Sequence, residues 1–126
     1  GEIDVKTRFD YTGIWIDGTG KALPMSSMET QHLLNTARML IQKPNRVLSI
    51  LIDDIEHETF DGREWKFRDT DDRRRSLKNV TSLSETELAE YVKSTPLFNS
   101  LIWELQERGV NTENLLNLYA CSEAFR

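Results

Sequence analysis

The clearest pattern in the chain is a helical spacing of apolar positions over residues 27–43. At about 100° per residue these positions share one face, which should be buried: Thr30, Leu33, Leu34, Ala37, Leu40 and Ile41. Ser26 and Glu29 fit the S-x-x-E capping box that opens helices, and Pro44 interrupts the pattern. The spacing therefore predicts a helix over 27–43 with one core face.

Upstream of this helix, β-forming residues dominate 11–16, and Asp17-Gly18-Thr19-Gly20 follows them. Glycine and aspartate tolerate the backbone conformations of tight turns, so 11–16 and 21–25 are predicted to form a β-hairpin. Pro24 cannot donate a ladder hydrogen bond, which indicates a short or edge second strand.

The middle of the chain is less regular. Residues 45–58 carry apolar positions that fit a helical face, although Val47–Ile52 fits a short buried strand equally well. Helix is preferred because the apolar face continues to Ile55. Residues 60–63 then predict a turn and 64–68 a short strand, whereas 69–79 is dense in charge and is interpreted as a mobile loop.

The last third predicts three helices. Ser84 and Glu87 form a second capping box, opening a helix to about Lys93. Thr95-Pro96 starts the next helix and Gly109 ends it, and Asn111 is expected to cap a final helix through about residue 123. The whole pattern predicts a mainly helical α+β fold, one domain over 1–126, with a short N-terminal β-hairpin. We expect these residues in its core: Leu33, Leu34, Ala37, Leu40, Leu51, Leu97, Leu101, Leu105 and Leu115.

The composition of the chain limits the classes of partner, fold and cellular setting that we expect. The net charge of −5 opposes broad phosphate binding, so nucleic acid is disfavoured as a partner. The single cysteine, Cys121, excludes an internal disulfide framework and a multi-cysteine zinc site, and indicates a reduced, cytoplasmic setting. No apolar run approaches the roughly 20 residues of a membrane span.

Signatures of catalysis or metal binding are missing from the sequence. With only His32 and His57, one chain cannot build a three-histidine zinc site. The acidic residues 53, 54, 56 and 58 do not have EF-hand spacing and are interpreted as a solvated face. The glycines of residues 17–21 depart from the P-loop pattern and predict a plain hairpin turn. We therefore expect no enzyme activity, no cofactor and no metal.

Two features are candidate binding elements. Trp103 lies off the apolar face of its helix, as an interface anchor would, unless a neighbouring element covers it. Arg73, Arg74 and Arg75, with Lys78, form a basic cluster that suits a phosphate or an acidic partner, unless the preceding aspartates neutralise it.

A second stripe on the 27–43 helix contains Met28, His32, Asn35 and Met39. With Trp15 it suggests a hairpin folded over the helix, in which His32 and Asn35 hydrogen-bond hairpin backbone. The alternative is that His32 and Asn35 line a pocket or a partner surface.

The run Trp15, Asp17-Gly18, Met28 and His32-Leu33-Leu34-Asn35-Thr36 resembles small bacteriophage and prophage proteins of unassigned function, as does the segment from Pro96 to Gly109. The resemblance covers about a third of the chain. It implies a phage or prophage origin and carries over no chemistry.

These observations favour a non-catalytic accessory protein that binds and modulates a bacterial host protein in the host cytoplasm, or that associates with itself. The alternative is a protein that binds or sequesters a nucleotide, with stacking from Trp15 and phosphate contacts from the glycine loop, Lys21, His32 and residues 73–75.

Overall fold

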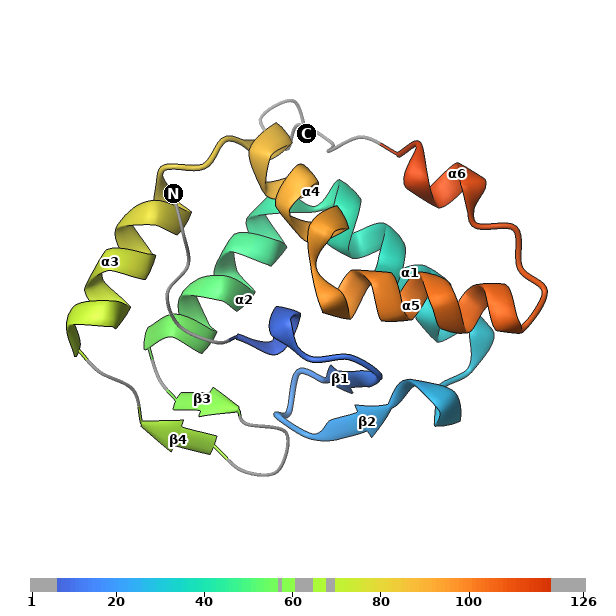
Figure 1. Cartoon of the computed structure of the whole chain (residues 1–126), viewed down its shortest axis with the longest axis horizontal. Helices are drawn as coiled ribbons and strands as arrows, with labels where there is room; N and C mark the ends of the chain where they lie inside the picture. Colours follow the sequence, from blue (N-terminus) through green and yellow to red (C-terminus); the bar gives the residue numbers. More distant parts are fainter. Residues whose placement is uncertain (1–6, 57, 61–64, 68–69, 119–126) are drawn as a thin grey trace.

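The computed structural model describes residues 7–56, 58–60, 65–67 and 70–118 (Figure 1). These residues form six α-helices, two short 3-10 helices and two antiparallel hairpins. The α-helices are α1 (Thr30–Gln42), α2 (Pro44–Glu56), α3 (Thr70–Thr81), α4 (Glu85–Ser94), α5 (Pro96–Glu107) and α6 (Glu113–Leu116). The other elements are η1 (Arg8–Asp10), β1 (Ile14–Ile16), β2 (Ala22–Pro24), η2 (Met25–Ser27), β3 (Glu58–Phe60) and β4 (Trp65–Phe67). The mainly helical α+β class with an N-terminal hairpin is confirmed.

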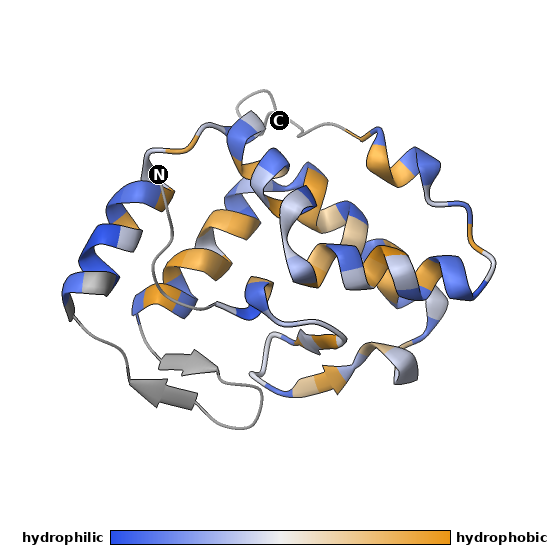
Figure 2. Ribbon diagram, viewed as in Figure 1, coloured by the Kyte–Doolittle hydropathy of each residue, from blue (hydrophilic) through white to orange (hydrophobic). Residues whose placement is uncertain are grey.

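The core lies where α1, α2, α4 and α5 pack against one another, with η1 against α5. Figure 2 shows the apolar residues of these helices gathered on their inner faces. All the residues predicted for the core are buried except Leu34, which is half-buried and packs against the others. None of the helices in the described part of the chain is both long enough and apolar enough to cross a membrane.

The start of α1 differs from the prediction. The expected capping box between Ser26 and Glu29 does not form, because residues 25–27 turn as η2 and α1 begins at Thr30. Met25 and Met28 are both buried, and Met28 N donates to the Met25 carbonyl oxygen at 3.1 Å. Burying both methionines therefore closes a 3-10 turn where the sequence suggested a first helical turn.

The N-terminal hairpin is confirmed, with Trp15 opposite Leu23 in β1 and β2. Its turn is closed by Asp17, whose Oδ1 accepts hydrogen bonds from Thr19 Oγ1 at 2.6 Å and from the amides of Thr19 and Lys21. These bonds, the one from the Thr19 hydroxyl above all, lower the pKa of the Asp17 carboxyl. The turn amides thus face the chain's own carboxylate, and the plain-turn interpretation of the loop is confirmed.

The described residues between 44 and 81 contain two helices and a second hairpin. The helical interpretation of 45–58 is confirmed as α2, which ends at Glu56, and β3 then pairs with β4 in a second hairpin. The interpretation of 69–79 as a loop is wrong, because α3 covers residues 70–81 and packs on α2. Leu77 and Val80 lie three apart on one strip, and arginine and lysine are good helix formers.

The boundaries of α4 and α5 follow the predicted caps. Ser84 and Glu87 form the capping box, Thr95 Oγ1 accepts from Phe98 N at 3.3 Å, and Gly109 has φ +81° after α5. The last helix is shorter than predicted, since α6 ends at Leu116. Asn111 was predicted to cap this helix. Its side chain accepts a hydrogen bond from the Glu113 amide, but the N-cap residue of α6 is Thr112. Asn117 and Leu118 are described and not helical, and residues 119–123 of the predicted helix, with Cys121, lie outside the described residues.

Candidate functional site

Trp103 is the most exposed large apolar side chain in the described part of the chain, with 60% of its surface accessible. It lies on the outer face of α5, whose opposite face buries Leu97, Leu101 and Leu105. The alternative in which a neighbouring element covers this tryptophan is therefore wrong. Both ends of α5 are capped, so a rigid helix presents the indole.

Trp15 is positioned differently. It belongs to β1 and is only 7% exposed, as part of the core. Its accessible edge lines a surface depression of about 500 Å³ between the hairpin and the α1–α2 corner. Gly18 and Arg46 line the same depression. The structure thus brings Trp15 and the glycine loop together, as the nucleotide alternative supposed.

The hairpin-fastening interpretation of His32 and Asn35 is wrong. Both side chains are exposed on α1, and Asn35 Oδ1 accepts a hydrogen bond from Gln31 Nε2 at 3.0 Å. The stripe that contained them is split, because Met28 is buried and Met39 packs partly against the core. One hydrogen bond that does fasten the start of the hairpin runs to α5, where Gly13 N donates to Ser100 Oγ.

The basic cluster lies on α3, at the end of the molecule away from α5 and α6 in Figure 1. Arg73 is half-buried, and its Nη1 donates to the Glu56 carbonyl oxygen at 2.8 Å, which ties α3 to the end of α2. Arg74, Arg75 and Lys78 are exposed. Arg73 is thus structural, whereas the other three cations face solvent.

Arg8 and Asp54 form a buried ion pair that the sequence pattern did not predict. Asp54 is 2% exposed, so its interpretation as part of a solvated acidic face is wrong. Arg8 Nη2 lies 2.8 Å from Asp54 Oδ1, Nε lies 2.9 Å from Oδ2, and Nη1 donates to the Ile16 carbonyl oxygen. The pair fixes the N-terminal segment and the hairpin to α2.

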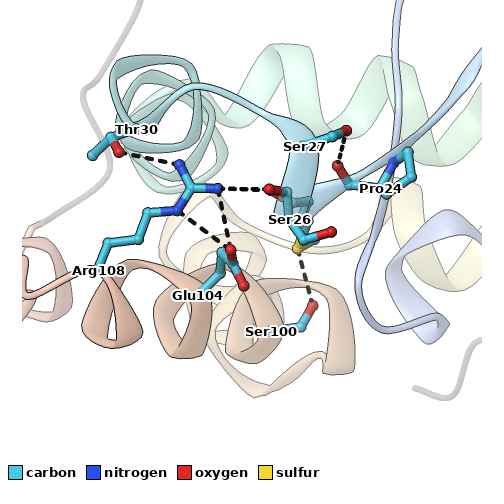
Figure 3. Close-up of polar contacts among 8 residues, drawn as sticks. Pro24, Ser26, Ser27, Thr30, Ser100, Glu104 and Arg108 are labelled. Carbon is cyan, nitrogen blue, oxygen red and sulfur yellow. Dashed lines mark hydrogen bonds and ion pairs between the residues drawn. The ribbon is translucent and has the colours of Figure 1, made fainter.

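A second cation, Arg108, joins separate elements in a similar way at the end of α5. Figure 3 shows its guanidinium between Glu104, Thr30 and the η2 turn. It donates to Glu104 Oε1 at 3.1 Å, to Thr30 Oγ1 at 3.1 Å and to the Met25 carbonyl oxygen at 3.1 Å. Glu104 and Arg108 form an ion pair one helical turn apart, and the bonds from Arg108 to Thr30 and Met25 hold the start of α1 against α5.

The described residues contain no group of three or more His, Cys, Asp or Glu side chains that could hold a metal ion. His57 and Cys121 lie outside the described residues. No family model, no curated protein and no solved structure matches the chain. The candidate sites are therefore the outer face of α5 and the depression beside Trp15.

Proposed function

We propose that the chain is a non-catalytic accessory protein, of phage or prophage origin, that binds and modulates a bacterial host protein in the host cytoplasm. The observation that carries the proposal is the exposure of Trp103 on a capped, well-packed helix. Tryptophan is enriched among residues that dominate binding energy, and a rigid scaffold reduces the entropy lost on binding.

The surroundings of Trp103 support a protein contact. Asn99, Gln106 and Glu107 are exposed on the same outer face, one helical turn from the indole. An apolar anchor within a polar rim is the usual anatomy of a protein interface. A second copy of this chain is the other partner that this face suits.

The test compares capture by the wild-type chain and by Trp103→Ser. Each is immobilised and exposed to bacterial lysate, and the retained proteins are quantified by mass spectrometry. We expect at least one protein to bind the variant about 30-fold more weakly, since an interface hot spot contributes about 2 kcal/mol or more.

Leu116→Ser is the matched control, because Leu116 is the other exposed large apolar side chain within the described part of the chain, at 45%. If both variants lose the captured protein equally, the capture would reflect non-specific hydrophobic adsorption and not binding at the Trp103 site. Capture that Trp103→Ser leaves intact, or no capture by the wild type, would refute the proposal. Sedimentation velocity of the purified chain separates self-association from host binding.

The nucleotide alternative has less support. Its supposed phosphate contacts lie on separate elements, with His32 on α1 and Arg73–Arg75 on α3. The amides of the glycine turn are directed to Asp17, which would repel a phosphate.

A further inference from the structure

The depression beside Trp15 continues into a second one of about 430 Å³. Both are lined by Arg8, Gly18, Ser49 and Ile50, so together they form one groove between the hairpin turn and α2. We call it the hairpin groove. It lies on elements other than α5, so it is separate from the Trp103 face.

One end of the hairpin groove combines apolar surface with a cation. Trp15 and Met39 line this end, Ile50 lines both depressions, and Arg46 stands beside them in the first turn of α2. Arg46 is exposed, and its side chain makes no polar contact with any residue that the structure describes. Arg8 also lines the groove, but the buried carboxylate of Asp54 balances its charge.

The other end of the hairpin groove is acidic. Asp17 and Asp53 line the second depression and do not line the first. The Asp17 pKa is lowered by its turn hydrogen bonds, so this carboxylate stays ionised near neutral pH. An anion is therefore attracted to the Arg46 end and repelled from the Asp17 end.

We propose that the hairpin groove binds a small apolar anion, with a flat or aliphatic body against Trp15, Met39 and Ile50 and one carboxylate or phosphate on Arg46. A polyphosphate does not fit this arrangement, because among the described residues that line the groove only Arg46 is a cation without a partner, and carboxylates stand at the far end. The volume of the first depression suits a body of one or two fused rings.

The test uses naphthalene-2-carboxylate and its uncharged carboxamide as matched probes, titrated into the isotopically labelled full chain. We expect the carboxylate to shift the backbone amide signals of Gly18, Ser49 and Ile50 in two-dimensional NMR spectra. The carboxamide should bind the same place about fivefold more weakly, the difference that one partly exposed ion pair produces. Phenyl phosphate, titrated in parallel, decides whether the anion is a carboxylate or a phosphate.

Arg46→Ala should abolish the preference for the carboxylate, whereas Arg38→Ala, which removes an exposed arginine outside the groove, should leave it unchanged. Ser49→Phe should fill the groove and weaken the binding of both probes. Equal unfolding midpoints of the variants establish that the fold is intact. The proposal is overturned if the carboxylate shifts no signal at the groove, if the shifts are spread evenly over the chain, or if Arg46→Ala retains the preference.

Discussion

Asp54 shows how much one buried polar residue determines here. Its carboxylate accepts from Arg8 Nε, Nη2 and the Arg8 backbone amide, all within 3.1 Å, and it is 2% exposed. The burial of Asp54 could have been predicted from its position on the helix, because Asp54 lies three residues after Leu51, on the buried side of α2. The partner could not be found the same way, since Arg8 is 46 positions away and no local pattern links the two.

Replacing Asp54 with Ala should lower the free energy of unfolding by about 3–5 kcal/mol, because the guanidinium of Arg8 would remain in a mostly buried place without its counter-charge. Urea unfolding measures the change. Glu56→Ala on the same helix is the control; Glu56 is exposed, and we expect a change within about 0.5 kcal/mol. A loss below about 1 kcal/mol for Asp54→Ala would mean that the pair contributes little.

Among the elements, those whose ends are set by local chemistry were predictable. Ser84, Thr95 and Gly109 each act on backbone groups within a few residues, so sequence spacing alone located the ends of α4 and α5. The helix α3 was not predictable from apolar content, because Leu77 and Val80 become informative only once α2 is in place to cover them. The predicted start of α1 was wrong for the converse reason: the local capping-box pattern is present, but burial of Met25 and Met28 accompanies a 3-10 turn in its place.

The capping box of α4 makes a prediction about pH. Glu87 Oε1 accepts from the Ser84 amide at 2.9 Å, and this bond lowers the pKa of Glu87 from the ordinary value of 4.5. The ionised carboxylate therefore stabilises the fold above about pH 4.5, and this contribution is lost as the pH falls through the lowered pKa. Glu87→Gln keeps an acceptor that does not titrate. Unfolding curves of the two proteins should differ at neutral pH and converge in acid.

Glu90→Gln, on an exposed position of the same helix, corrects for the loss of one negative charge. If the difference between wild type and Glu87→Gln stays constant from about pH 6 to about pH 3, the carboxylate is not the group that stabilises the helix start.

At the scale of the whole molecule, the two candidate sites differ in how far sequence could reach them. The exposure of Trp103 follows from helix periodicity within α5, so the residue could be nominated in advance. The hairpin groove could not, because η1, β1, the turn, α1 and α2 each contribute to it. Arg46, which is the one cation without a partner among the described residues that line it, has no distinguishing sequence context. Sites of this kind arise from packing between distant segments, which a single sequence does not specify locally.

The packing of the N-terminal segment against α4 and α5 can be tested by substitution. Phe9 of η1 is fully buried, its ring lies 6.2 Å from that of Tyr91 on α4, and η1 also packs on α5. Burial of the Tyr91 hydroxyl raises its pKa, in keeping with a closed environment. Phe9→Ala should therefore cost about 3–5 kcal/mol, a large share of the 5–15 kcal/mol typical of a domain. Thr12→Ala, on an exposed position of the same segment, should change the free energy of unfolding by less than about 0.5 kcal/mol. If urea unfolding gives the two variants similar midpoints, η1 is not part of the cooperative core, and the groove it helps to line would lose its rigid wall.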